Sequence, residues 1–292
     1  MPKVTIILVN WNNRVDTLDC LRSLKSLTYP NFEVVIVDNG STDDSARAIK
    51  EAYPDIAMME MGENLGFTGG NNAGIRYALR NNSDYVLLLN NDTVVDPGFL
   101  DALVKVAESD SKIGVVGPKI YYLREPKKIW YLGGRIDYWR GETIAIGSNE
   151  VDDGRYVVPE DTDLINGCAL LAKREVFEKV GLLYEPMFCY LEENDFCARV
   201  KRHGYRLLYV PEAVIWHKVA ASASAIKDFQ LFYFTRNRII FMKRNARPLQ
   251  LLFFLPYYAL TFVFLKLVLA IGQLKWSQAG LIIRAFYEGL TT

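Results

Sequence analysis

Short apolar runs alternate with segments of helical periodicity through residues 3–120, and this alternation constrains the fold more than any other feature of the chain. We expect strands at residues 4–9, 33–38, 56–61, 85–89 and 115–116. We expect helices at residues 15–27, 41–53, 71–80 and 97–108, with Ser41 or Thr42 as the cap of the second. Strands and helices that alternate at this spacing indicate an α/β fold, with a mostly parallel sheet flanked by helices on both faces.

The later part of the chain changes character twice. Residues 119–162 are rich in Tyr, Trp, Gly and charged residues, and we expect short antiparallel strands there. Order returns at residues 163–172, followed by a helix at 192–203 and a strand at 206–210. A helix with aromatic and basic faces is expected at 226–245, and residues 249–290 are strongly apolar. We therefore divide the chain into residues 1–225, with halves 1–118 and 119–225, and a C-terminal helical region at 226–292.

Bulk composition excludes several classes of protein. The 34 basic and 34 acidic residues cancel, which argues against a generic nucleic-acid-binding protein. The four cysteines contain no CxxC pair, so we expect reduced thiols in a cytosolic protein rather than a disulfide framework or zinc site. The N-terminal apolar run is short and no small-residue cleavage site follows it, which predicts no secretory signal.

Polar residues stand where the predicted strands end. They are Asn10 and Asn12 after the first strand, Asp38 and Asn39 after the second, Asn64, Gly66, Gly70 and Asn71 before the third helix, and Asn90, Asn91 and Asp92 after residues 85–89. Each group alone is an ordinary turn or cap. Because the carboxyl ends of parallel strands share one edge of a sheet, where such sheets bind ligands, we expect these residues to converge on one site.

The residue types at this edge suit a phosphorylated nucleotide. Asp38 can accept hydrogen bonds from a base or a ribose, and glycines let the backbone approach a bulky ligand. Asp92 offers a hard oxygen ligand for Mg²⁺ or Mn²⁺, ions that bridge phosphates rather than occupying an all-protein cage.

Taken in order, NWN at 10–12, VDNGSTD at 37–43, NLGFTGGN at 64–71 and LNND at 89–92 resemble the family 2 glycosyltransferases of the GT-A fold, in particular their rhamnosyltransferase-like branch. The resemblance covers roughly residues 3–245. It implies that Asp38 and the neighbouring amides and glycines bind a nucleotide sugar, and that Asp92 holds a metal ion on the donor diphosphate. Asn90 stands where many relatives carry a first aspartate, so the metal role in this motif falls on Asp92.

A second acidic segment, Glu192-Glu193-Asn194-Asp195, opens the predicted helix at 192–203. Acidic residues in a first helical turn are favourable for structural reasons alone. The family motif at this place is Glu-Asp-x-Asp, and its second residue, the catalytic base, corresponds to Glu193. Because glutamate replaces the usual aspartate, Glu192 and Asp195 remain alternative catalytic residues.

Only two histidines are present. His203 is expected near a helix C-terminus. His217 follows a strand-like segment at 213–216, and the resemblance implies that it contacts the metal or the diphosphate. The implied reaction is a single displacement at the anomeric carbon, assisted by one base and inverting that centre.

The tail begins with the basic residues Lys243, Arg244 and Arg247, and residues 249–265 carry no charge. Seventeen residues is close to the lower limit for a membrane span, and Pro256 would kink one. We rank attachment to the membrane surface first, self-association as a homodimer second and a true span third. The basic flank predicts the cytoplasmic, inner face of the cell membrane.

The sequence therefore predicts a metal-dependent inverting glycosyltransferase. It would move rhamnose or a similar hexose from a dTDP-, UDP- or GDP-sugar to a glycan or lipid-linked acceptor in surface polysaccharide synthesis. Two alternatives are a non-catalytic module that binds sugar nucleotides or scaffolds an assembly, and a sugar-nucleotide nucleotidyltransferase. The latter would need a glycine- and arginine-rich loop with a lysine after the first strand, and residues 10–13 offer none.

Overall fold

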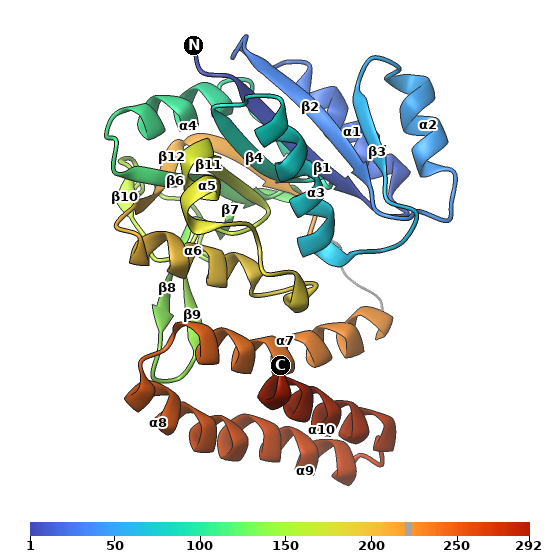
Figure 1. Ribbon diagram of the computed structural model, residues 1–292, viewed down its shortest axis with the longest axis vertical. Helices are drawn as coiled ribbons and strands as arrows, with labels where there is room; N and C mark the ends of the chain where they lie inside the picture. The colour runs from blue at the N-terminus through green and yellow to red at the C-terminus, as the bar shows by residue number, and fades with distance from the viewer. Residues whose placement is uncertain (220–223) are drawn as a thin grey trace.

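The computed structural model describes residues 1–219 and 224–292 (Figure 1). Its main sheet has the strand order β10-β12-β6-β11-β4-β1-β2-β3, with β5 paired to β12 and β7 paired to β6. The bounds are β1 Val4–Asn10, β2 Phe32–Asp38, β3 Ala57–Glu60, β4 Tyr85–Asn90, β5 Thr93–Val95, β6 Ile113–Tyr122, β7 Glu125–Tyr131, β10 Glu160–Asp161, β11 Ala169–Lys173 and β12 Arg206–His217. Strands β1 to β4 are parallel, as is β6 with β12, whereas β11 runs antiparallel to both its neighbours. The mostly parallel sheet is confirmed.

Helices cover both faces of this sheet, because successive strand residues point to opposite sides. Ile6 and Leu8 of β1 join the core beneath the helices α1 and α4, whereas Ile7 between them joins the core beneath α3 and α6. The helix bounds are α1 Arg14–Leu24, α2 Ser45–Ala52, α3 Gly66–Arg80, α4 Phe99–Glu108, α5 Arg174–Val180 and α6 Glu192–Arg202, with a short 3₁₀ turn, η1, at Glu185–Met187.

Three predicted helix boundaries were wrong. α1 ends at Leu24, and Val15, which the three-residue periodicity placed on the core face, is exposed. α2 begins at Ser45 rather than near Ser41, because the Ser41 hydroxyl is hydrogen-bonded to Asp38 instead of capping a helix. α3 begins at Gly66 rather than residue 71, since tertiary packing overrides the low helix propensity of its glycines.

The segment between β6 and β11 forms the expected short antiparallel strands. β7 pairs with β6, and β8 (Gly133–Asp137) pairs with β9 (Glu142–Ile146) as a separate hairpin. Figure 1 shows this hairpin extending from the sheet domain toward the C-terminal helices. β12 continues to His217 past a register shift between Val210 and Val214, so its end lies at the same edge as the tip of β4.

The C-terminal region is a helical layer beneath the sheet domain (Figure 1). It consists of α7 (Ser224–Asn245), α8 (Pro248–Tyr258), a π-helical segment η2 (Ala259–Phe264), α9 (Leu265–Gly272) and α10 (Trp276–Thr291). From Pro248 to Gly272 the chain is continuously helical, through Pro256, with a mean hydropathy of 2.0. By length and composition alone, this one helix among the described residues could cross a membrane.

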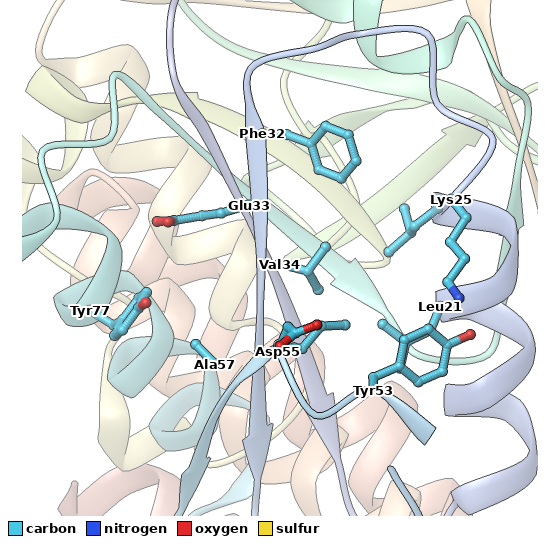
Figure 2. Close-up of a pocket in the computed structure, with 11 residues that line it drawn as sticks. Leu21, Lys25, Phe32, Glu33, Val34, Tyr53, Asp55, Ala57 and Tyr77 are labelled. Atoms are coloured by element: carbon cyan, nitrogen blue, oxygen red, sulfur yellow. The ribbon is translucent and has the colours of Figure 1, made fainter. Parts of the chain in front are cut away.

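A hollow of about 410 Å³ lies at the amino ends of β2 and β3 (Figure 2). Lys25 and Tyr53 lie on one side of β2, and Glu33 and Tyr77 on the other. The Glu33 carboxylate already contacts Thr5 and Lys3. Because this hollow is at the opposite end of the strands from the polar tips, it does not contribute to the site they form.

Candidate active site

The polar strand tips converge, as predicted, on a cleft of about 730 Å³ at the carboxyl ends of β1, β2 and β4. Polar residues of the strand tips and loops line this cleft: Asn13, Asn39, Asn64, Asn71, Asn90, Asn91 and Asp92. Trp11 and five further aromatic residues line it as well, and we call these five the aromatic wall: Phe67, Phe188, Tyr190, Phe229 and Tyr233. The cleft therefore offers both hydrogen-bonding groups and aromatic rings.

Asp38 lies behind the cleft rather than on its surface. Its buried carboxylate accepts hydrogen bonds from Asn10 Nδ2 at 2.9 Å, from the Ser41 hydroxyl at 2.6 Å and from the Ser41 amide at 3.1 Å. Asn12 Oδ1 accepts from the Thr42 and Asp43 amides at 2.7 and 3.2 Å. Asn10, Asn12 and Asp38 thus fix the loops after β1 and β2.

Asn39 connects the tip of β2 to the start of α3. Its Nδ2 donates to Asn64 Oδ1 at 3.1 Å and to the Gly66 carbonyl at 3.0 Å, while its Oδ1 accepts from the Leu65 amide at 3.0 Å. Asn64 Oδ1 also accepts from the Gly66 amide at 2.8 Å. This network holds the N-terminal turn of α3 against the cleft.

The glycines of this turn serve close packing within the protein. Gly66 has φ +70°, and a Cβ there would lie 2.4 Å from the Phe188 carbonyl oxygen. A Cβ on Gly70 would lie 2.9 Å from Val9 Cγ1. Only Gly66 of the two lines the cleft, and the missing side chain of Gly70 makes room for β1; that Gly70 contacts a bulky ligand stays a prediction.

Asp92 and His217 lie side by side because β5 pairs with β12 directly after Asp92, with His217 opposite Thr93. His217 Nε2 is 3.0 Å from Asp92 Oδ1, and its ring stacks edge-on against Trp130 at 4.5 Å. Burial disfavours the imidazolium, but Cys168 and Asp92 outweigh burial and raise the pKa of His217 to about 10. Within the described residues, its Nδ1 is buried without a hydrogen-bond partner.

Glu192 and Glu193 open α6 beside the aromatic wall. Tyr190 and Leu191 before them both have φ near +69°, which turns the chain sharply into the helix. Oε2 of each glutamate is buried and, among residues 1–219 and 224–292, has no hydrogen-bond partner. Burial raises the pKa of both carboxyls, and repulsion from Glu193 adds to the rise at Glu192. Such unpartnered carboxyls are candidates for proton transfer.

Asp195 has a different environment from the two glutamates. It is fully buried, and its carboxylate accepts from Arg199 Nε at 2.8 Å, Arg244 Nε at 2.8 Å and Asn245 Nδ2 at 2.9 Å. Although burial alone would raise its pKa, these partners hold it below the ordinary value. Asp195 therefore joins α6 to α7, and its fully engaged carboxylate is less suited to act as a base than the two glutamates.

Residues 5–181 match the family model described as glycosyl transferase family 2. The chain belongs to this family. It is 28% identical over 226 residues to the N-acetylglucosaminyl-diphospho-decaprenol L-rhamnosyltransferase of Mycobacterium tuberculosis, covering 69% of this chain and 71% of the relative. It is 22% identical over 265 residues to the dTDP-rhamnosyl transferase RfbF of Shigella flexneri, covering 84% and 81%. The resemblance to the rhamnosyltransferase-like branch is confirmed.

Solved structures confirm the GT-A fold of this glycosyltransferase. The mannosyltransferase PcManGT from Pyrobaculum calidifontis, in complex with GDP-Man and Mn²⁺, superposes with a TM-score of 0.64 at 18% identity, covering 99% of this chain and 87% of that one. Residues 1–349 of Staphylococcus aureus TarS, in complex with UDP-GlcNAc, superpose with a TM-score of 0.60 at 14% identity, covering 98% and 81%.

The cleft of the glycosyltransferase brings together most of the residues expected at the strand tips. Seven of them line it: Asn39, Asn64, Gly66, Asn71, Asn90, Asn91 and Asp92. Several of their side chains also make contacts within the protein: Asn39 and Asn64 hold the start of α3, Asp92 contacts His217, Asn71 Nδ2 donates to the Phe67 carbonyl and Asn91 Nδ2 donates to the Thr17 hydroxyl. Asn10, Asn12, Asp38 and Gly70 lie outside the lining.

Sequence reasoning missed the aromatic wall and the residue that positions it. Asn237 of α7 is fully buried, and its Nδ2 lies 2.8 Å from the carbonyl oxygens of Met187, Cys189 and Tyr190. It thereby fixes the loop that precedes Glu192. The spacing of Phe229 and Tyr233 on one face of a predicted helix was the available signal for the wall, whereas nothing local distinguishes Asn237.

Proposed function

We propose that this glycosyltransferase transfers rhamnose or a similar hexose from a nucleotide-diphosphate donor to a hydroxyl of a glycan or lipid-linked acceptor, with inversion at the anomeric carbon. One observation carries the proposal: the polar strand tips, Asp92 and the aromatic wall line one cleft, and α6 opens beside the wall residue Tyr190 with Glu192 and Glu193, whose buried Oε2 atoms have no hydrogen-bond partner among the described residues. The names of two rhamnosyltransferase relatives and of the hexosyltransferase Agl10 of Haloferax volcanii, 27% identical over 243 residues, support the sugar class.

The donor is assigned to the polar residues that line the cleft. Asn39, Asn64, Asn90 and Asn91 present amide groups there, and Asp38 lies just behind them at the tip of β2. A carboxylate has about four lone-pair sites, so Asp38 keeps capacity for a nucleoside hydroxyl or ring N–H beyond its present partners. This assignment agrees with the general location of nucleotides beyond the carboxyl ends of parallel strands.

Asp92 and His217 would hold Mg²⁺ or Mn²⁺. The described residues contain no group of three or more His, Cys, Asp or Glu side chains suited to a metal. A carboxylate with one imidazole nevertheless fits an ion that takes its other ligands from water and substrate phosphates. When bound, such an ion supplies positive charge that stabilises the leaving diphosphate.

Glu193 is proposed as the base. Its side chain is partly exposed whereas Glu192 is buried, so Glu193 is the more accessible to an acceptor. Its carboxylate takes the proton of the acceptor hydroxyl as that oxygen attacks the anomeric carbon from the face opposite the nucleotide. The raised pKa brings this group nearer to the operating pH, which favours proton transfer.

The acceptor is assigned to the aromatic wall. Phe188 and Tyr233 stack at 5.3 Å between ring centroids, and Phe229 lies 4.5 Å from Tyr233. These rings present apolar surface next to Glu192 and Glu193, which suits the less polar face of a sugar. The wall is formed jointly by α7, the loop before α6 and Phe67 of α3, so the C-terminal layer takes part in the site.

We further propose that α8 to α10 bind the cytoplasmic face of the cell membrane. Large apolar side chains are exposed along this layer: Leu249, Leu252, Phe253, Leu260, Phe264, Leu265, Val268, Leu269, Ile271, Leu274, Trp276 and Ile283. Exposed apolar patches of this extent usually mark an interaction surface. At ~2 kcal/mol for each large side chain transferred from water, hydrophobic insertion would dominate the attachment. Self-association through the same face is the alternative outcome.

A donor panel tests the proposed activity. The full-length protein is incubated with dTDP-, UDP- and GDP-sugars, with Mn²⁺ or with EDTA, and its thermal stability and sugar transfer are measured. We expect one nucleotide class to stabilise the protein in the presence of the ion, and NMR to show an inverted anomeric centre in the product. Retention of configuration, or no stabilisation by any donor, would contradict the proposal.

A further inference from the structure

A second cavity, of about 540 Å³, is lined by residues of α7 other than Phe229 and Tyr233 of the aromatic wall. It is enclosed by the β8–β9 hairpin at Glu142 and Thr143, by α7, and by the continuous helix of α8, η2 and α9. We call it the basic pocket because Lys227, Arg238 and Lys266 all line it. Glu142 is its one acidic lining residue, so the lining carries a net positive charge.

The cations of the basic pocket are incompletely neutralised. Arg238 Nη2 contacts Glu142 Oε1 at 2.9 Å and the Arg140 carbonyl at 2.6 Å, but in the described part of the chain its buried Nε has no partner. Among residues 1–219 and 224–292, neither Lys227 nor Lys266 forms an ion pair. The guanidinium of Arg238 lies over the Tyr258 ring at 4.6 Å, which fixes its position.

Lys266 is the only charged residue in the helix Pro248–Gly272. It lines the pocket together with Tyr258 and Phe262, which lie at earlier turns, and its Nζ is 5.6 Å from the Phe262 ring centre. A charge within so apolar a segment is costly near lipid and is usually retained for function. The π-helical segment immediately before it is a feature that recurs at functional sites.

The basic pocket lies between the aromatic wall and the exposed apolar face. Phe234 of the pocket stacks on Tyr190 of the wall at 4.5 Å, and Leu191 and Gln230 adjoin wall residues in sequence. Lys227 and Lys266 also line a further hollow of about 310 Å³ that continues to Leu269 and Gln273 of the α9 region. Three chemical environments therefore follow one another: aromatic, cationic and apolar.

We propose that the basic pocket binds the phosphate groups of a lipid-linked acceptor. In a sugar joined through phosphates to a long apolar chain, the sugar, the anionic linker and the chain occur in the same order as the three environments. Lysine and arginine are the side chains that bind phosphate through charge-assisted hydrogen bonds. This inference rests on the proposed function, because it assigns the phosphate groups of that reaction's acceptor to the basic pocket, next to the aromatic wall that would hold the sugar.

The test uses the full-length protein with Lys227→Gln, Lys266→Gln and the double variant. Farnesyl diphosphate is titrated by calorimetry in EDTA, so that no ion at Asp92 contributes. We expect binding by the wild-type chain, a loss of about tenfold for each substitution, equivalent to ~1.4 kcal/mol, and no comparable binding of farnesol. Lys275→Gln is the matched control, since it removes one exposed lysine charge from the same layer outside the pocket.

Two further measurements distinguish a lipid-linked acceptor from membrane phospholipid as the source of the phosphate. They also distinguish acceptor binding from a purely structural role of the two lysines. The pocket variants should raise KM for a lipid diphosphate acceptor while leaving transfer to a neutral alkyl glycoside and flotation with anionic phospholipid vesicles at the Lys275→Gln level. Equal losses with both acceptors would indicate a structural role, and reduced flotation would indicate binding of membrane phospholipid; either result overturns the proposal. If no acceptor is glycosylated, the proposed function fails, while the farnesyl diphosphate titration still tests the pocket. Unchanged binding of farnesyl diphosphate by the double variant refutes the assignment of the phosphate groups to the basic pocket.

Discussion

Oδ1 of Asp92 lies 3.0 Å from Nε2 of His217, and the antiparallel pairing of β5 with β12 holds the two residues together. Asp92 lines the cleft, whereas His217 is buried behind it. The pair joins residues 1–118, which carry the strand tips assigned to the donor, to β12. A substitution at one of these two residues should therefore change a measurable property of the other, such as its pKa.

We predict that Asp92→Asn weakens ion-dependent donor binding without unfolding the protein. The amide keeps the shape of the side chain but removes the negative charge that attracts a divalent ion. Calorimetry with the preferred nucleotide sugar, with and without Mn²⁺, should show the loss. Unchanged affinity together with unchanged ion dependence would remove Asp92 from the metal site.

The same substitution should lower the pKa of His217. Burial disfavours the imidazolium and is opposed by Cys168 and Asp92 together, so removing the Asp92 carboxylate takes away part of what raises the pKa. In the wild-type protein, the resulting stabilisation is fully present below the unfolded pKa near ~6.5 and is lost as pH rises through about 10. An NMR titration of the His217 ring in EDTA measures the change, and an unaltered pKa in Asp92→Asn would contradict the pairing.

Glu193→Gln should bind donor normally and lose turnover by roughly two orders of magnitude or more, the usual scale for a general base. Because burial raises the pKa of Glu193, wild-type turnover should rise with pH along a limb above the ordinary glutamate value of ~4.3. That limb should be absent in the variant. Glu192→Gln is the matched control, and a larger loss there would transfer the role to Glu192.

Asp195→Asn should reduce the free energy of unfolding by about 3 kcal/mol, because it breaks a buried ion pair and leaves Arg199 and Arg244 without a counter-charge. The lowered pKa means that this stabilisation is present above the unfolded value of ~3.9 and is lost as pH falls through the folded pKa. Urea unfolding measures it. The control Asp161→Asn breaks an exposed pair with Arg206 and should cost under about 1 kcal/mol. Full stability with no turnover would instead restore a catalytic role for Asp195.

Gly66→Ala should destabilise the protein and weaken donor binding, since the new Cβ would meet the Phe188 carbonyl oxygen at 2.4 Å in a left-handed backbone conformation. Gly62→Ala is a close control: its φ of +76° is similar, but nothing lies within 4 Å of the added carbon. The control should cost ~1–2 kcal/mol from backbone strain alone. Equal effects of the two substitutions on thermal unfolding and donor affinity would show that contact with the Phe188 loop is unimportant.

The full-length protein should float with liposomes and remain bound at high salt, because apolar insertion rather than charge holds it there. The double variant Leu260→Gln, Leu269→Gln should reduce binding about 100-fold, at ~1.5 kcal/mol for each side chain. Val151→Gln with Val157→Gln removes two similarly exposed apolar groups outside the helical layer and should have no effect. A discrete dimer without flotation would assign the face to self-association.

The sequence by itself determined the sheet and the position of the site, because both follow from local information. Apolar runs and helical periodicity predicted β1 to β4, and the parallel arrangement brought Asn39, Asn64 and Asp92 to one edge. The glycines of α3 showed the limit of this reasoning. Their low helix propensity predicted a loop, but close packing of Gly70 against Val9 makes the helical turn possible.

The tertiary structure decided the roles of charged and polar side chains, since these depend on partners far away in the chain. Glu193 and Asp195 belong to the same acidic run, yet Arg244 and Asn245 of α7 engage Asp195, whereas Oε2 of Glu193 has no partner among residues 1–219 and 224–292. Asn237 positions the loop before Glu192 only because α7 packs beneath it. Local patterns specify which segments become strands and helices, whereas burial and long-range hydrogen bonds determine what each side chain can do.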